Sequence, residues 1–149
     1  MTTRYPSQFK IYKKIGAAQF GLIRPRQDQN GRIEKDGAIL LEVAKSKGEK
    51  SYDWSNKISF AIGMSDLTTI FQNPDNPGSL IHTMPGSNTT KKLEFQPGEG
   101  RYAGTFKVVC SEFSKDKSVN KTVMVPVSSG EYTVLLRLFM AAAPKFLGW

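Results

Sequence analysis

The chain has 149 residues, a formal net charge of +8 at pH 7, one cysteine and one histidine. This length suits a single domain over residues 1–149, and the lone Cys110 excludes a disulfide framework within the chain. A zinc site built from Cys and His needs three or four such ligands and is excluded too. No apolar run approaches the roughly 20 residues that span a bilayer, and residues 1–10 lack a secretory signal. We expect a soluble protein of the bacterial or virus-infected cytoplasm or nucleoid, or of an organelle if the chain is a processed form.

The first half of the chain is typical of about four strands. An extended stretch runs from Phe9 to about Arg24, and residues 29–31 (Gln-Asn-Gly) mark a turn. Asp36-Gly37, a strong hairpin signal, precedes an apolar run over residues 38–44. Residues 57–64 alternate apolar and polar side chains, as a half-buried strand does.

A short helix and a second set of strands follow. Ser65-Asp66 can cap a helix in which apolar residues recur three and four apart, and the Pro- and Gly-rich residues 73–78 end it. Four further strands are predicted over residues 79–83, 91–95, 102–113 and 119–127. Residues 98–100 (Gly-Glu-Gly) form a turn between two of these strands.

A last helix is predicted after Ser128, which forms a capping box with Glu131. It runs from Tyr132 to Pro144 and is apolar nearly all the way round over Val134–Ala143. Such a helix must be buried on more than one face, which favours a subunit interface over burial in its own core. The pattern of four strands and a helix, repeated twice, indicates an α+β fold.

The sequence offers little for catalysis. Cys110 lies in an alternating strand and is interpreted as a small buried hydrophobe, and His82 as a surface or edge residue. Carboxylates are scattered singly, without a metal-binding loop. We therefore expect a protein that is not an enzyme, with no catalytic residues, no metal and no cofactor.

Positive charge is concentrated in residues 1–57, which hold 12 of the 21 basic and 6 of the 13 acidic residues. Aromatic residues are interleaved with this charge, namely Tyr5, Phe9, Tyr12, Phe20, Tyr52 and Trp54. Single-strand binders combine cations that follow phosphates with aromatic faces on which bases stack. The candidate nucleic-acid-binding residues are Lys10, Tyr12, Lys13, Lys14, Arg24, Arg26, Tyr52, Trp54, Lys57, Lys91, Lys92, Arg101, Tyr102 and Lys107.

Duplex-reading patterns such as the helix-turn-helix or zinc finger are missing, as is the aromatic motif of the RNA-recognition module. The residues predict a protein that binds single-stranded nucleic acid and is largely indifferent to sequence, and they do not distinguish DNA from RNA. Two alternatives stay open: an RNA-binding or RNA-annealing protein on the same fold, and a structural oligomeric β protein. Roles in replication, repair or transcription would all use the same surface.

Three segments resemble the Whirly family of single-stranded DNA-binding proteins. Tyr52-Asp53-Trp54-Ser55, followed by Lys57, an alternating strand and a short helix, is similar to the family's central signature. The ending Pro144-Lys-Phe-Leu-Gly-Trp149 and the run Ile39-Leu40-Leu41 after Asp36-Gly37 also fit. The resemblance covers about residues 10 to 149.

The resemblance implies two four-stranded antiparallel sheets packed as blades, with two helices and a tetramer assembled around the helices that include Val134–Ala143. It also implies binding of single-stranded DNA across sheet edges and neighbouring protomers. Kinetoplastid mitochondrial guide-RNA-binding proteins share this fold and bind RNA. One segment departs from the family: Tyr12 is followed by Lys-Lys-Ile-Gly-Ala-Ala-Gln, where plant members carry Lys-Gly-Lys-Ala-Ala-Leu.

Overall fold

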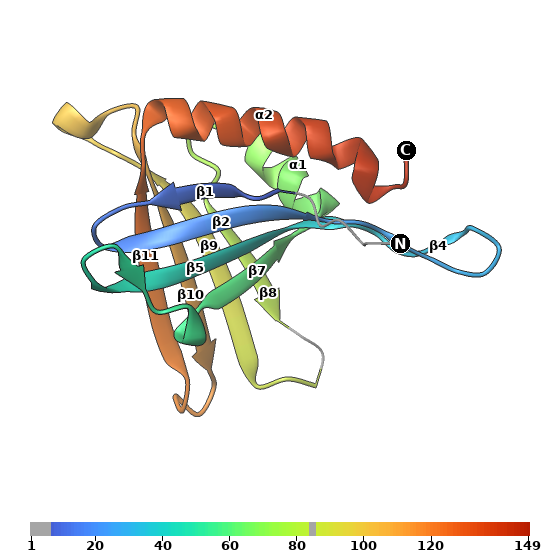
Figure 1. The fold of residues 1–149 in the computed structure, drawn as a ribbon, viewed down its shortest axis with the longest axis horizontal. Coiled ribbons are helices and arrows are strands. Elements are labelled where there is room, and N and C mark those ends of the chain that lie inside the picture. The colour runs from blue at the N-terminus through green and yellow to red at the C-terminus, as the bar shows by residue number, and fades with distance from the viewer. Residues whose placement is uncertain (1–6, 84–85) are drawn as a thin grey trace.

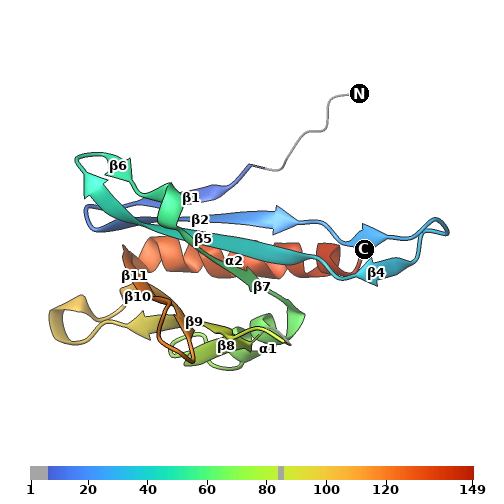
Figure 2. The same ribbon diagram turned by 90° about the horizontal axis from the view of Figure 1, so that it is seen from below.

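Two antiparallel β-sheets frame the chain in a computed structural model that describes residues 7–83 and 86–149. The strands of one sheet run across those of the other in Figure 1, and the sheets form an upper and a lower layer in Figure 2. Tyr5, one of the aromatic residues singled out above, lies outside the described residues.

The first sheet comes from the N-terminal half. β2 and β5 pair in register from Gly16↔Lys45 to Ile23↔Ala38, β1 pairs with the free side of β2, and β6 and β7 both pair with β5. The strands are β1 (Phe9–Tyr12), β2 (Gly16–Ile23), β5 (Ala38–Gly48), β6 (Ser51–Tyr52) and β7 (Ile58–Ile62). A separate hairpin of β3 (Arg26–Gln27) and β4 (Ile33–Lys35) extends from one end of this sheet.

The second sheet has the order β11-β10-β9-β8, with every neighbouring pair antiparallel. Its strands are β8 (Ser79–Thr83), β9 (Thr89–Pro97), β10 (Phe106–Ser114) and β11 (Asn120–Val127). Side chains alternate as expected for a sheet with one buried face, because Val108 and Cys110 are fully buried while Lys107 points outward.

Two helices complete the fold. α1 (Met64–Gln72) links β7 to β8, and α2 (Ser129–Phe146) lies between the two layers in Figure 2. Phe139 of α2 places its ring 5.9 Å from that of Phe20 in the first sheet and 6.4 Å from that of Phe95 in the second. One hydrophobic cluster therefore joins both sheets and both helices.

The fold class is confirmed as α+β, with differences in the number and bounds of the strands. The extended stretch predicted over residues 9–24 is two strands, β1 and β2, joined by a turn in which the Lys13 amide donates to the Gly16 carbonyl. β6 joins the first sheet as a short fifth strand. In the second half, Tyr102 belongs to a 3-10 helix, η2 (Gly100–Tyr102), and β10 starts later, at Phe106.

Asp36-Gly37 does not form a hairpin, because β4 pairs with β3 and β5 pairs with β2. The Gly37 amide instead donates to the carbonyl of Phe146 at 2.9 Å. A Cβ at this position would lie 2.5 Å from the Ile23 carbonyl oxygen, so this close approach requires glycine.

Both helix starts use carboxylate caps. α1 begins at Met64 rather than after Ser65, and the Asp66 carboxylate accepts from the amide of Gly63 at 2.9 Å. The predicted capping box of α2 is confirmed: Ser128 Oγ accepts from the Glu131 amide, and Glu131 accepts from the Ser128 amide. α2 continues through Pro144 to Phe146, so the predicted end of the helix at Pro144 is wrong by the length of its last turn.

Candidate nucleic-acid interface

Three aromatic side chains lie in series at one end of the first sheet. The ring of Tyr12, at the end of β1, stacks on that of Tyr52 on β6, with centroids 5.6 Å apart. The ring of Trp54, in the 3-10 helix η1 (Trp54–Asn56), lies 6.4 Å from that of Tyr52. Tyr12 is 54% exposed, and the other two are half-buried. Exposed ring faces in series can each accept an unpaired nucleobase.

Hydrogen bonds around Asp53 fix the backbone that carries Trp54. The Asp53 amide donates to the Lys45 carbonyl at 2.8 Å. Its carboxylate accepts from Ser55 Oγ at 2.7 Å and from Asn56 Nδ2 at 2.8 Å. The hydrogen bonds from Asn56 and Ser55 lower the pKa of Asp53 below its ordinary value. An ionised Asp53 therefore holds the Trp54 turn in one conformation at neutral pH.

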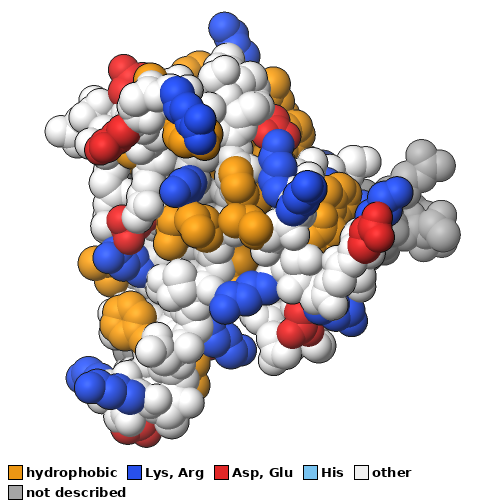
Figure 3. All heavy atoms as spheres, turned by 90° about the vertical axis from the view of Figure 1, so that its left-hand side faces the viewer, with side chains coloured by type: hydrophobic (Ala, Val, Ile, Leu, Met, Phe, Trp, Pro, Cys, Tyr) orange, Lys and Arg blue, Asp and Glu red, His pale blue; other side chains and the backbone are white. Residues whose placement is uncertain are grey.

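The three rings border a hollow of about 530 Å³, which we call the aromatic trough. It is lined by Tyr12, Lys47, Lys50, Ser51, Tyr52 and Trp54. Lys47 and Lys50 are exposed, and no carboxylate in residues 7–83 or 86–149 is ion-paired with either. Figure 3 shows the side of the molecule with the β1–β2 and β5–β6 turns, where hydrophobic side chains are surrounded by Lys and Arg. Rings beside cations suit a ligand that has both flat bases and phosphates.

The outer face of the first sheet also carries a buried carboxylate. Glu42 is 7% exposed, accepts from Gln19 Nε2 at 3.0 Å and is ion-paired with Lys57. Burial raises the pKa of Glu42, but hydrogen bonds from Lys57 and Gln19 outweigh it and leave the pKa below its ordinary value. Lys10 is exposed on the same face, in register with Gln19. The charge of Lys57 is thus largely balanced by Glu42.

A second hollow of about 720 Å³, which we call the inter-sheet crevice, lies between the β1–β2 turn and the second sheet. Its lining includes Lys13, Tyr102 and Lys107 among the predicted residues. Lys13 Nζ is 2.9 Å from Glu131 Oε1. The guanidinium carbon of Arg101 lies 4.9 Å from the centre of the Tyr102 ring. The crevice therefore also combines an exposed ring with cations.

The remaining predicted residues do not line either hollow. Arg24 follows β2 at the end opposite Tyr12, roughly 20 Å away at about 3.3 Å per residue. Arg26 is ion-paired with Glu34 at 3.2 Å in the β3–β4 hairpin. Lys91 and Lys92 lie on β9, where Lys92 is 3.1 Å from Glu94. Lys14 is exposed in the β1–β2 turn.

Sequence reasoning missed three residues of the aromatic trough, the cations Lys47 and Lys50 and the small Ser51. The signal was present, because Lys45-Ser-Lys-Gly-Glu-Lys50 is a dense run of cations directly before Tyr52. Of the aromatic residues grouped with the basic half, Phe20 is a core residue, only 4% exposed. Its position on the inner face of β2 removes it from any binding surface.

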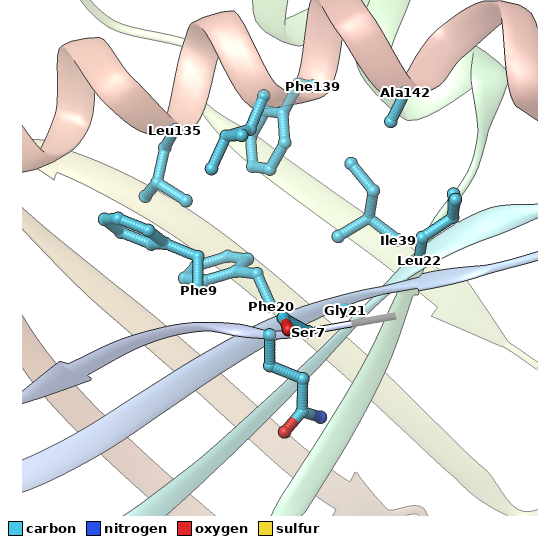
Figure 4. Close-up of a pocket in the computed structure, with 11 residues that line it drawn as sticks. Ser7, Phe9, Phe20, Gly21, Leu22, Ile39, Leu135, Phe139 and Ala142 are labelled. Atoms are coloured by element: carbon cyan, nitrogen blue, oxygen red, sulfur yellow. The ribbon is translucent and has the colours of Figure 1, made fainter. Parts of the chain in front are cut away.

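An apolar pocket of about 320 Å³ lies between α2 and the first sheet. Figure 4 shows Leu135, Phe139 and Ala142 of α2 facing Phe9 and Phe20 of the strands. Leu138, at 42% exposure, also lines it. With no Lys or Arg in its lining, this pocket does not resemble a site for a phosphate backbone.

Cys110 and His82, the two residues weighed for catalysis, are both engaged in packing. Burial raises the pKa of the Cys110 thiol to about 12, so it is protonated and unreactive at neutral pH. His82 Nε2 is 2.9 Å from Asp66 Oδ2, and its ring stacks on Phe60. Among the described residues, no three His, Cys, Asp or Glu side chains gather as a metal site. Over the same residues, no helix has the length and hydropathy of a bilayer span.

Comparisons with known proteins agree with this architecture. Residues 11–138 match the family model described as Whirly transcription factor. The chain is 26% identical over 127 residues to the single-stranded DNA-binding protein WHY1, chloroplastic, of Arabidopsis thaliana, covering 79% of this chain and 46% of that protein. It is 27% identical over 132 residues to the mitochondrial WHY2 of the same plant, covering 80% and 52%. The chain thus spans about half the length of the curated relatives it matches.

Solved structures show the same fold. The crystal structure of WHY1 from Arabidopsis thaliana matches with a TM-score of 0.88 and 24% identity, over 100% of this chain and 89% of that one. A guide-RNA-binding protein complex bound to a guide RNA matches with a TM-score of 0.52 and 11% identity, over 97% and 94%. The family model covers most of the chain, from within β1 to within α2, and includes the Tyr-Asp-Trp-Ser signature. The chain belongs to the Whirly family.

Proposed function

We propose that this chain is a non-enzymatic single-stranded DNA-binding protein, with the aromatic trough as the place where bases stack. The observation that carries the proposal is the series of Tyr12, Tyr52 and Trp54 beside two cations without carboxylate partners among the described residues. The names of the curated relatives point the same way. Bases would stack on the rings and phosphates would lie near Lys47 and Lys50, which requires no particular sequence.

A duplex fits this arrangement poorly. The bases of a duplex are paired and stacked on each other, so their flat faces are not free to contact Tyr12 or Trp54. The trough also lies at the β1–β2 and β5–β6 turns rather than on a protruding helix that could enter a major groove. Selectivity for single strands therefore follows from the ring stack.

The first experiment measures affinity by fluorescence anisotropy for labelled single-stranded DNA of about 16 nucleotides, its RNA counterpart and the matching duplex, each at two salt concentrations. We expect single strands to bind more tightly than the duplex, and affinity to fall steeply with salt. Equal or tighter duplex binding would contradict the proposal. Tighter binding of RNA would favour an RNA-binding role, and no binding to any strand would favour a structural β protein.

Trp54→Ala tests the trough directly. Loss of one stacked base costs about 1–3 kcal/mol, so we expect affinity for single-stranded DNA to fall about fivefold to a hundredfold. Trp149→Ala is the matched control, because Trp149 is 85% exposed and lies outside the trough. Equal affinities of the two variants would remove Trp54 from the binding site.

The two lysines of the trough have a separate signature. Lys47→Gln and Lys50→Gln should each reduce the slope of log affinity against log salt by about 0.7, the value expected for one phosphate on a single strand. Lys35→Gln, on β4 at the far end of the first sheet, removes the same charge and should leave the slope unchanged. A common loss of slope in all three variants would indicate a diffuse effect of net charge instead.

The site is proposed to work in an oligomer. Val134, Leu138 and Met140 of α2 are 43%, 42% and 63% exposed, although the helix is apolar on its other side as well. The two sheets of one chain both pack on α2 at Phe139, but they leave Val134, Leu138 and Met140 uncovered. A second copy of the chain on this surface, and a tetramer as the family resemblance implies, would cover it.

A further inference from the structure

The inter-sheet crevice adjoins the aromatic trough through the β1–β2 turn. Tyr52 Oη donates to the backbone carbonyl of Lys13 at 2.7 Å, which ties the trough to this turn. Tyr12, the first ring of the trough, directly precedes Lys13, whose side chain lines the crevice. The trough and the crevice are therefore lined by neighbouring residues of one turn.

The crevice presents one exposed ring on an ordered loop, with Arg101 over one side of that ring. Tyr102 is 55% exposed, and its loop is held by hydrogen bonds from Thr105 Oγ1 to the Tyr102 carbonyl (2.6 Å) and from the Gly98 amide to the Thr105 carbonyl (2.8 Å). A Cβ on Gly98 would lie 2.3 Å from the Tyr102 carbonyl oxygen, so the tight loop requires glycine there. The ring is thus presented in a fixed position rather than on a free chain.

Cations outnumber carboxylates around this ring, though by less than in the trough. Arg101 lies over Tyr102 and also donates from Nη2 to Tyr102 Oη at 2.8 Å. Lys107 projects from the outer face of β10, where no described carboxylate is ion-paired with it. Glu99 lines the crevice, and Glu131 is paired with Lys13. We therefore expect stacking on the ring and contact with one phosphate here, not a long phosphate track.

We propose that the inter-sheet crevice binds a further nucleotide of the strand that occupies the aromatic trough, with its base on Tyr102 and its phosphate at Lys107. The inference rests on the proposed function and extends it. It adds a second stacking position, and it predicts that the bound strand runs from the trough to the crevice. The ligand class is a nucleotide unit recognised by its flat base and its charge, without base-edge readout. A single strand therefore needs a minimum length to fill both hollows.

The test compares Tyr102→Ala with the unaltered chain over single-stranded DNA of increasing length, from about 4 to about 16 nucleotides. Strands too short to leave the trough should bind both proteins equally. Long strands should bind Tyr102→Ala at least fivefold more weakly, and Tyr102→Phe, which keeps the ring, should stay near the unaltered affinity. Phe113→Ala is the control, because this ring is also exposed but lies at the other end of β10.

A second measurement uses the unaltered chain and locates the end of the bound strand, so it does not depend on whether Tyr102→Ala folds. A strand with a photoreactive base at one end, long enough to fill both hollows, should crosslink to Tyr102, and one that fills only the trough should not. Lys107→Gln should reduce the salt slope by about 0.7 for long strands only.

The outcomes separate the crevice from the trough. Equal affinity of Tyr102→Ala and the unaltered chain at every length, with Trp54→Ala still weakened, would overturn the crevice and leave the proposed function standing. An equal loss of affinity by Tyr102→Ala at all strand lengths would also overturn it, because Tyr102 would then act on strands too short to reach the crevice. Failure of the unaltered chain to bind any single strand would refute both.

Discussion

Glu42 places a negative charge on the same sheet face as Lys10 and the aromatic trough, where a polyanion is proposed to bind. Its carboxylate is nearly buried and is held by Gln19 and Lys57. A buried carboxylate with such partners stays ionised, and its pKa is correspondingly lowered. Lys57 is therefore a weak candidate for phosphate contact although it follows the Tyr-Asp-Trp-Ser signature.

Glu42→Gln should strengthen binding of single-stranded DNA. The amide keeps the shape and can still accept from Gln19, but the variant loses a charge that repels phosphate and that neutralises Lys57. We expect tighter binding at about 50 mM salt and a salt slope steeper by up to about 0.7. Titration of Glu34→Gln, which frees Arg26 in the distant β3–β4 hairpin, serves as the control. Equal or weaker binding by folded Glu42→Gln would show that Lys57 does not respond to its partner.

At the scale of elements, the start of α2 is joined to the first sheet by one carboxylate. Glu131 accepts from the Ser128 amide at 2.9 Å and is 2.9 Å from Lys13 Nζ in the β1–β2 turn. Burial raises the pKa of Glu131, but hydrogen bonds from Lys13 and Ser128 outweigh it and lower the pKa overall. The helix cap thus also positions a side chain of the inter-sheet crevice.

Ser128→Ala should lower the free energy of unfolding by about 1 kcal/mol, because the Glu131 amide loses its side-chain acceptor. Urea denaturation followed by circular dichroism measures this loss. Ser129→Ala, one residue into the helix, should change stability much less, since it is exposed and is not the capping residue. If both variants lost a similar free energy of unfolding, the loss would come from changed solvation of a serine and not from the cap.

Elements with a local signal were predictable, whereas those set by pairing were not. β8 has the predicted bounds, and Ser128 with Glu131 identified the start of α2. The turn after Tyr12 carries a weak signal, because Gly16 is the one usual turn residue in Lys13-Lys14-Ile15-Gly16. Asp36-Gly37 carries a hairpin signal, but contacts with Ile23 and Phe146, far away in the sequence, determine its conformation.

The same division applies to the binding surface. Tyr52 and Trp54 were identified from a local motif, and their neighbours Lys47 and Lys50 could have been. The stacking of Tyr12 on Tyr52 depends on the register of β1, β2 and β5, which the sequence alone does not fix. The neutralisation of Lys57 by Glu42 depends on cross-strand geometry in the same way.

For the whole molecule, α2 is the element with surfaces on two sides. Tyr132, Leu135, Phe139 and Phe146 are buried in the core, while Val134, Leu138 and Met140 face outward. Arg137 is exposed on this outward side as well, and Leu138 lines the apolar pocket beside the first sheet. Exposed apolar side chains next to an apolar pocket favour an interface.

We expect light scattering to give a mass above the 16.6 kDa of one chain, fourfold for a tetramer. Leu138→Asp should shift the mass towards that of the monomer, because it places a charge in the proposed interface. Ile81→Asp is the control. Ile81 is apolar and 62% exposed like the residues of the proposed interface, but it lies on β8 and not on α2. A monomeric unaltered chain at micromolar concentration would contradict the assembly.

The position of Phe139 has a consequence for biosynthesis. Its ring packs against Phe20 of the first sheet and Phe95 of the second, yet it is translated after every strand of both sheets. During translation both sheets therefore lack the side chains that fill the space between them, and their apolar inner faces stay open until α2 emerges. The nascent chain is consequently more exposed to chaperones and to aggregation than a protein whose core is completed from the N-terminal end.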